Sequence, residues 1–338
     1  MTDVVNQKDN RQYFSDLDPS SELGTLAGTE VTTAPLARRH LSQKQHYRTD
    51  HHSHIHSSQD ILLNDSETIS LAIEAAIAIV INGIHYAVLM ASPSQIEYLA
   101  VGFLFSEGLI RHSHELLDWE VSKLSDANKL ELFMANTDES LSTNHSFDHL
   151  LDYDTYIVEL TLNQRCHQHI QAQRRILAGR TGCGMCGVTG LSQALPDLSD
   201  YFVDRKNALT TRPSLEHLLN IREQVNQQQD THLVTGAVHG AATLYDDQLY
   251  LFEDVGRHNA LDKLVGWQIR HKEPVECVVM TSRLSIELVQ KSIRLGIPWL
   301  VGMSAPTSTA VRVAKRYGLG LAGFLRANRV TYYSGLAD

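Results

Sequence analysis

Two cysteines separated by two residues are the part of the sequence best suited to covalent chemistry. Cys183 and Cys186 lie in the glycine-rich stretch at residues 182–187. Three arginines precede this stretch: Arg174, Arg175 and Arg180. Positive charge nearby favours the thiolate, which is the nucleophilic form, and the spacing lets one thiol attack a sulfur atom bound to the other. The dithiol is compatible with redox, metal-binding or sulfur-transfer chemistry, and its spacing alone does not separate the three.

The other two cysteines have a structural interpretation. Leu162, Cys166 and Ile170 repeat at helical spacing, which predicts that Cys166 is a buried core thiol. Cys277 opens a short apolar run that reads as a buried strand. In a reducing compartment a lone pair of the C-x-x-C type is more often catalytic or metal-binding than a structural disulfide.

Two other interpretations of the cysteine loop fail on context. Gly182, Gly184 and Gly187 match the dinucleotide-binding pattern G-x-G-x-x-G, but that pattern needs a strand before it and a helix after it, whereas a charged helix is expected before it here. A structural zinc site usually takes four ligands, and one C-x-x-C pair supplies two. A zinc deaminase needs H-x-E ahead of its cysteines, but the match at residues 271–273 follows them. We therefore predict no metal ligands.

A second group of polar residues lies where expected strands give way to helices. It comprises Arg257, His258, Ser282, Arg283, Ser304 and Thr307. Ligands of open α/β sheets bind outside the carboxyl ends of the strands, and helix starts offer free N–H groups to anions. These loops therefore predict a site for a phosphate-bearing ligand. The alternative is that Asp254, Ser282 and Thr307 only cap helices, which explains the two arginines and His258 less readily.

The elements that must position these residues follow from hydrophobic periodicity. In the first half, residues 76–90 predict a hairpin around Asn82-Gly83, and Ser92-Pro93-Ser94 opens a helix that Gly108 ends. Further strands are expected around Trp119, at 130–134 and at 153–162. In the second half the expected strands are 241–245, 248–252, 277–280, 299–303, 319–324 and 330–333, and the expected helices are 257–270, 284–295 and 307–317. Such alternation predicts an α/β sheet layered with helices.

Composition restricts the setting of this chemistry. The chain has 338 residues and a net charge of −10, so two domains are expected and nucleic acid is not an expected partner. The most apolar stretch, residues 75–90, is interrupted well short of the roughly 20 residues that a membrane span needs. The amino terminus has no secretory pattern, which predicts a cytoplasmic protein without membrane attachment.

Two polar segments are expected to be disordered or solvated. Residues 1–66 have few aromatic residues and a histidine-rich tract, and composition favours a solvated tail over a metal-binding one. Residues 137–152 read as a solvated acidic loop. The expected organisation is therefore a tail at 1–66, a small α+β domain at 67–165 and an α/β domain at 166–338 that carries the cysteine loop.

Taken together, these residues resemble the FdhD/NarQ family over about residues 68–334. The matching stretches are residues 90–93, 102–108, 179–187, 235–239, 253–263, 281–283, 290–291, 304–307 and 323–324. The tail and the acidic loop depart from the compact pattern of the family. The resemblance implies that the second domain has a three-layer cytidine-deaminase-like fold without the zinc ligands, and that the protein forms homodimers.

The resemblance also implies a function. Family members take sulfur from a cysteine desulfurase as a persulfide and pass it to the molybdenum bis(molybdopterin guanine dinucleotide) cofactor before its insertion into formate dehydrogenase. The persulfide cysteine maps onto Cys183, with Cys186 as its neighbour. The cofactor-binding segment maps onto Phe324, Leu325, Arg326, Ala327, Asn328 and Arg329. GDP is then the expected cofactor analogue. The alternatives are a cofactor-binding chaperone without sulfur transfer and a thiol–disulfide oxidoreductase.

Overall fold

The computed structural model describes residues 36–46, 63–126, 133, 148–166, 170, 191–201 and 212–335. Its largest element is a six-stranded sheet in the order β12-β11-β10-β9-β7-β8. These strands are β7 (His239–Tyr245), β8 (Gln248–Asp254), β9 (Cys277–Met280), β10 (Trp299–Gly302), β11 (Gly320–Arg326) and β12 (Arg329–Ser334). The strands β9, β10 and β11 are parallel, whereas β7 and β12 run antiparallel to their neighbours. The carboxyl ends of β8, β9, β10 and β11 therefore lie at one edge.

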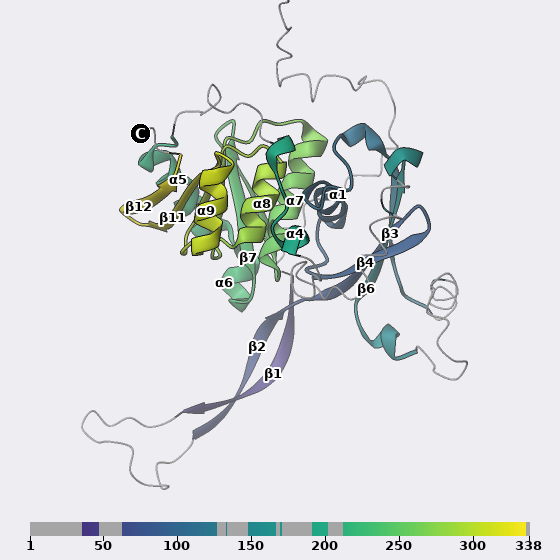
Figure 1. The fold of residues 1–338 in the computed structure, drawn as a ribbon. Helices are drawn as coiled ribbons and strands as arrows, with labels where there is room; N and C mark the ends of the chain where they lie inside the picture. Colours follow the sequence, from purple (N-terminus) through teal and green to yellow (C-terminus); the bar gives the residue numbers. More distant parts are fainter. Residues whose placement is uncertain are drawn as a thin grey trace, which may run out of the picture.

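Helices cover both faces of this sheet. One face packs against α7 (Arg257–His271), α8 (Ile286–Arg294) and α9 (Ser308–Arg316), through buried residues that include Leu264, Leu288 and Ala310. The other face packs against α5 (Leu215–Gln228), through Leu218 and Ile221. Alternating side chains of each strand thus enter two separate apolar layers. The α/β class expected from the sequence is confirmed, with three layers (Figure 1).

A second, four-stranded sheet has the order β4-β3-β6-β5. It contains β3 (Ala75–Ile81), β4 (Ile84–Ala91), β5 (Leu116–Lys123) and β6 (Thr155–Leu162), and it packs against α1 (Ile96–Ser106). Asn82 and Gly83 have φ angles of 48° and 75°, as the type I′ turn of the expected hairpin requires. The predicted hairpin and helix are both confirmed.

The two sheets meet through α1 and α7, which cross at very short range. A Cβ atom added to Gly102 of α1 would lie 1.8 Å from the carbonyl oxygen of Asp262, and one added to Gly266 of α7 would lie 1.9 Å from that of Tyr98. Each helix therefore needs a residue without a side chain where the other passes. As a result α7 is enclosed by the sheet on one side and by α1 on the other, and residues 260–269 are all buried.

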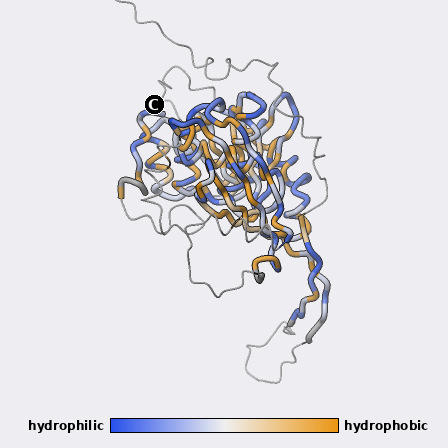
Figure 2. Tube along the Cα trace, turned by 90° about the vertical axis from the view of Figure 1, so that its right-hand side faces the viewer, coloured by the Kyte–Doolittle hydropathy of each residue, from blue (hydrophilic) through white to orange (hydrophobic). Residues whose placement is uncertain are grey.

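A two-stranded arm corrects one expectation. Strand β1 (Ala37–His46) pairs along its whole length with β2 (Leu63–Ala72), so order begins before residue 66 and not near Ile69. Figure 1 shows the arm projecting away from both sheets, and in Figure 2 it is mainly hydrophilic, whereas hydrophobic segments gather in the body. The composition is that of a solvated segment, but backbone pairing does not require an apolar face in every strand.

Most remaining elements of the second half are confirmed to within two residues at either end. Most of the expected strand at 130–134 and of the acidic loop at 137–152 lies outside the described residues, as does the cysteine loop at 182–187, and residue 133, which is described, is helical and not extended. Neither α5 nor the short helix α6 (Asp230–Thr235) that follows it was predicted from the sequence. No helix in the described ranges is long and apolar enough to cross a membrane.

Candidate functional site at the carboxyl edge of the sheet

Three of the predicted loops are joined by backbone hydrogen bonds. The N–H of Leu284 donates to the carbonyl of Ala305 at 3.1 Å, and the N–H of Thr307 donates to the carbonyl of Leu284 at 3.0 Å. The N–H of Phe324 donates to the carbonyl of Ser304 at 3.1 Å. The loop after β9, the loop after β10 and the end of β11 therefore form one continuous surface, which we call the rim (residues 281–285, 303–307 and 324–326).

The fourth loop, between β8 and α7, reaches the same edge through His239. This histidine opens β7, where it pairs with Asp254 at the end of β8, and the N–H of the next residue donates to Thr281 Oγ1 at 2.8 Å. Burial, followed by the positive charges of Arg257, His232 and Arg283, lowers the pKa of His239. Arg257 and Arg283, two of the predicted cations from different loops, therefore both act electrostatically on this imidazole.

Arg257 has unused hydrogen-bonding capacity. Its Nε atom is buried and has no partner among the described residues. The residue before it, Gly256, is the N-cap of α7 and supplies no side-chain acceptor to the first turn. Free N–H groups of a helix start and an unpaired guanidinium nitrogen are donors of the kind that an anion satisfies. Arg283, on the adjacent loop, is exposed to solvent.

His258, the next predicted residue, points into the protein and not toward solvent. Its Nε2 lies 3.4 Å from Ser285 Oγ and 3.9 Å from a carboxylate oxygen of Glu287. Burial, together with the positive charges of Lys291 and Arg257, lowers the pKa of His258 to about 4. The ring is therefore neutral near pH 7 and supports the loop from behind the rim.

The capping alternative is correct for one of its three residues. Thr307 is the N-cap of α9, and its hydroxyl accepts a hydrogen bond from the N–H of Ala310. Ser282 caps no helix: its hydroxyl is buried and donates to the carbonyl of Arg283 at 3.1 Å. Asp254 also lies outside the N-cap position, since Gly256 occupies it. Any contact between Ser282 and a ligand would have to use its backbone.

Asp254 instead forms a fully buried ion pair. Its Oδ2 lies 2.7 Å from Nζ of Lys263, and both side chains are 0% exposed. The same oxygen accepts the N–H of Ser92 at 3.0 Å. The predicted site therefore rests on residues of the segment between β4 and α1, which belongs to the other sheet.

The segment predicted to bind the cofactor divides into parts that face different ways. Phe324 has a φ of 53° and its side chain is 40% exposed, an unusual backbone conformation for a bulky residue. Leu325 is fully buried in the core, so only its backbone is available to a ligand. Arg326 donates to the carbonyl of Met303 at 2.6 Å, which holds its guanidinium against the rim. Ala327 is exposed in the turn that follows.

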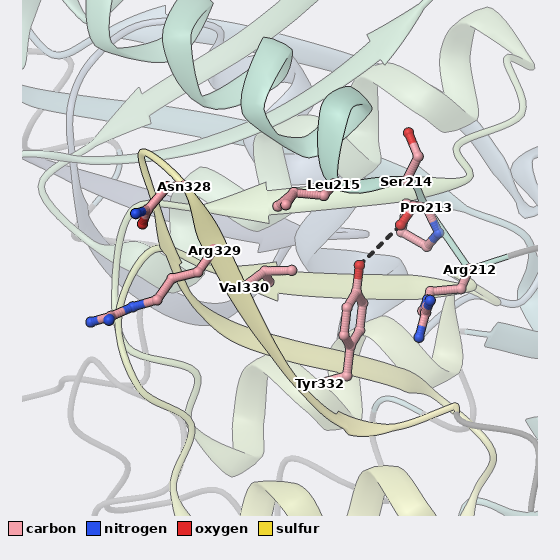
Figure 3. A pocket seen from close by; sticks show the side chains of 8 residues that line it. All are labelled: Arg212, Pro213, Ser214, Leu215, Asn328, Arg329, Val330 and Tyr332. Carbon is pink, nitrogen blue, oxygen red and sulfur yellow. Dashed lines mark hydrogen bonds between the residues drawn. The ribbon is translucent and has the colours of Figure 1, made fainter.

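Asn328 and Arg329 line a separate pocket of about 450 Å³. Its other lining residues are Arg212, Pro213, Ser214, Leu215, Val330 and Tyr332. Figure 3 shows that the side chains of Arg329 and Arg212 extend on opposite sides of Tyr332, whose hydroxyl donates to the carbonyl of Pro213 at 3.0 Å. The guanidinium of Arg212 lies 4.8 Å from the centre of the Tyr332 ring. Arg326 and Arg329 pair directly across β11 and β12, but Arg329 lines this pocket whereas the Arg326 guanidinium binds the Met303 carbonyl.

The four cysteines fall into two classes. Cys183 and Cys186, together with the arginines before them, lie outside the described residues. Cys166 and Cys277 are buried, as expected. Burial raises the pKa of Cys166 to about 11 and that of Cys277 to about 12, so both stay protonated and weakly nucleophilic near neutral pH.

Comparison with known proteins identifies the family. The FdhD/NarQ family model matches residues 72–337. The chain belongs to the FdhD/NarQ family. It is 37% identical over 268 residues to the sulfur carrier protein FdhD of Acinetobacter baylyi, an alignment that covers 77% of this chain and 85% of that protein. The FdhD protein of Chromobacterium violaceum is 37% identical over 269 residues, covering 78% of this chain and 88% of that one.

A solved structure agrees with the fold. The crystal structure of a protein named as a formate dehydrogenase accessory protein from Desulfotalea psychrophila superposes with a TM-score of 0.55 at 18% identity. The superposition covers 89% of this chain and 97% of that one. The FdhD/NarQ match begins at residue 72, so β1 and nearly all of β2 precede it, and the arm is an addition to the matched region.

Sequence reasoning missed several residues that build this edge. His239, Lys263 and Lys291 lie inside stretches that matched the family pattern, but spacing gave no reason to treat them differently from other charged residues of the same helices and strands. Arg212 had no local pattern at all. An available signal was the run Asp262-Lys263, two charged residues in the middle of a helix whose neighbours on both sides are apolar.

Proposed function

We propose that this chain is a sulfur carrier that accepts sulfur from a cysteine desulfurase as a persulfide on Cys183 and delivers it to molybdenum bis(molybdopterin guanine dinucleotide). The cofactor would then enter formate dehydrogenase. The observation that carries the proposal is membership of the FdhD/NarQ family, with relatives at 34–37% identity that are named sulfur carrier proteins. In this proposal the chain acts as a cytoplasmic sulfurtransferase and a homodimer.

Loading of Cys183 with sulfur needs no external oxidant. The Cys183 thiolate attacks the terminal sulfur of the desulfurase persulfide, a new S–S bond forms, and the desulfurase cysteine leaves as a thiolate. Unloading needs two electrons to release the sulfur as sulfide. Attack of the Cys186 thiolate on the Cys183 sulfur supplies them, since it forms a disulfide and expels hydrosulfide.

The unreactive character of the other two thiols supports this assignment. A carrier cysteine must ionise near neutral pH, and Cys166 and Cys277 have pKa values of about 11 and about 12 because they are buried. The C-x-x-C pair is therefore the only dithiol in the sequence to which this chemistry can be assigned.

The cationic rim supports binding of the guanine dinucleotide ends of the cofactor as a substrate. The charges of Arg257 and Arg283 both lower the pKa of the His239 imidazole, and Arg257 Nε is a buried donor without a partner among the described residues. Guanidinium groups pair with phosphates through two hydrogen bonds. Phe324 adds an exposed aromatic face at the same rim, which suits a planar base. GDP is the simplest probe of this site.

The proposal is tested by complementation in cells that lack their own carrier. Cys183→Ala should abolish formate dehydrogenase maturation while the protein stays folded, and Cys166→Ala should retain it. Full formate dehydrogenase activity with Cys183→Ala would overturn the assignment of the acceptor thiol.

A further inference from the structure

Lys263 and Asp254 form an ion pair that is fully buried in the protein. Nζ of Lys263 lies 2.7 Å from Asp254 Oδ2, and neither side chain is exposed. The free-energy cost of removing two charges from water is about as large as the attraction between them, so such a pair contributes little net stability over apolar residues of the same volume. The pair matters instead because it fixes the position of the loop between β8 and α7.

The hydrogen bonds around Lys263 hold the loop between β8 and α7 against the segment between β4 and α1. Nζ of Lys263 donates to the carbonyls of Ser92 and Glu253, at 3.1 Å each, and to Ser94 Oγ at 3.2 Å. The hydroxyl of Ser92 accepts the N–H of Val255 at 3.2 Å. The segment between β4 and α1 thus fixes residues 253–255, which lead from β8 into α7.

The same carboxylate also sets the first turn of α7. Asp254 Oδ1 accepts the N–H of Gly256 at 2.8 Å and Nδ2 of Asn259 at 3.0 Å. Nδ2 of Asn259 also donates to the carbonyl of Met90 at 2.8 Å. Arg257, whose Nε has no hydrogen-bond partner among the described residues, therefore sits between Gly256 and Asn259, which are both tied to this network.

We propose that Ser92, Asp254 and Lys263 are positioning residues that hold Arg257 in the geometry required for phosphate binding at the rim. The inference rests on the proposed function, in which the rim binds a guanine nucleotide. None of the three side chains is itself available to a ligand, because each is buried. The small sheet and α1 thereby contribute to the ligand site without contacting the ligand.

A second buried cluster supplies a matched control. Ser106, at the other end of α1, is also buried, and its hydroxyl donates to Asp262 Oδ1 at 2.6 Å and accepts from Nζ of Lys291 at 2.7 Å. The hydroxyl of Ser106 bonds to Phe103, Asp262 and Lys291, none of which lies in residues 253–257. Ser92→Ala and Ser106→Ala therefore each remove one hydroxyl from an almost fully buried site, the first just before α1 and the second at its end, and only the first touches residues 253–257.

The test measures GDP affinity of the full chain by titration calorimetry. Ser92→Ala should weaken GDP binding about tenfold, the factor that corresponds to about 1.4 kcal/mol, whereas Ser106→Ala should change it less than about twofold at a similar loss of melting temperature. The charge-neutral double variant Asp254→Asn/Lys263→Met should weaken binding at least as much as Ser92→Ala. This double variant disturbs the same loop, residues 253–257, by removing a different set of contacts.

A double-mutant cycle separates positioning from general destabilisation. If Ser92 acts through Arg257, then Ser92→Ala should have little further effect on GDP affinity in an Arg257→Ala background. Equal losses from Ser92→Ala and Ser106→Ala, or additive effects of Ser92→Ala and Arg257→Ala, would overturn the inference. Absence of GDP binding to the wild type would instead overturn nucleotide binding at the rim, and with it this inference.

Discussion

Lys291 and Asp262 form a second buried ion pair, with Nζ 3.0 Å from Oδ2, that ties α8 to α7 where α1 crosses. Glu107, at the end of α1, lies 3.1 Å from the same ammonium group. The family-pattern stretches at residues 102–108 and 290–291 thus meet in space, although 180 or more positions separate them. Together with the Lys263 pair, this cluster joins the small sheet to the α/β layers.

Removing the ammonium group should destabilise the fold strongly. Lys291→Met leaves the Asp262 carboxylate buried and uncompensated, which typically costs about 3–5 kcal/mol. Lys44→Ala is the control, because its bridge to Glu67 lies in the exposed arm and such pairs contribute about 0–1 kcal/mol. Urea unfolding followed by circular dichroism measures both. A loss below about 1 kcal/mol for Lys291→Met would show that the cluster is dispensable.

The neutral state of His258 predicts a specific pH dependence of stability. Its pKa in the folded protein is about 4, below its value in the unfolded chain, so the unfolded state binds more protons as the pH falls. Stability from this group is therefore complete above the unfolded pKa of roughly 6.5 and is lost progressively as the pH falls toward 4.

This dependence is measured by unfolding at pH 7.5 and pH 5. The contribution of His258 should fall by about 2 kcal/mol between them, and His258→Gln should remove that difference, whereas the exposed His114→Gln should not. If the wild type and His258→Gln lose the same stability on acidification, His258 is not held neutral in the folded protein.

The two arginines of the cofactor segment should both contribute to GDP binding, from different places. GDP should raise the melting temperature of the wild type, since a ligand that binds only the folded state stabilises it by mass action. Arg326→Ala removes a guanidinium held at the rim by the Met303 carbonyl, and Arg329→Ala removes one from the pocket near Tyr332. Each should reduce the shift, and added salt should reduce it further.

The double variant is the decisive comparison. Persulfide loading of Arg326→Ala/Arg329→Ala should remain normal, because contact with the desulfurase and contact with the cofactor would use different surfaces. GDP binding to this variant as tight as to the wild type would remove the segment from the ligand site, and loss of loading in the folded double variant would contradict the separation of surfaces.

Cys277 should matter for stability and not for sulfur transfer. Cys277→Ala should lower the free energy of unfolding by about 1 kcal/mol, as expected for truncation of a small buried side chain, and should load persulfide normally. Its thiol should also resist alkylation in the folded protein, because burial raises its pKa to about 12. Rapid alkylation of Cys277 in the native state would disprove this assignment.

The sequence contains enough local information to predict most of the elements but not the contacts between them. Asn82-Gly83 predicts its hairpin because few other dipeptides accept two positive φ angles in succession. The arm was missed because β1 is polar on both faces, which leaves no period-two apolar pattern to detect.

Only the part of the site that follows from the order of the elements could be predicted from the sequence. Arg257, Arg283 and Phe324 could be placed at one edge because the carboxyl ends of parallel strands share an edge. The buried positions of Lys263 and Lys291 could not, because helical periodicity assigns a residue to a face but does not say that α1 covers the outer face of α7. The pocket near Arg212 is lined in part by the start of α5, and no sequence motif predicts that helix.

The most direct test of the central claim is the intact mass of the protein after incubation with a cysteine desulfurase and cysteine. A sulfur carrier gains the mass of sulfur, a thiol–disulfide oxidoreductase loses two hydrogens, and a cofactor chaperone does not change. We predict a gain of sulfur for the wild type and for Cys277→Ala, removed by dithiothreitol, and no gain for Cys183→Ala. An unchanged wild-type mass, or the same gain of sulfur in folded Cys183→Ala, would contradict the assignment of Cys183 as the sulfur acceptor.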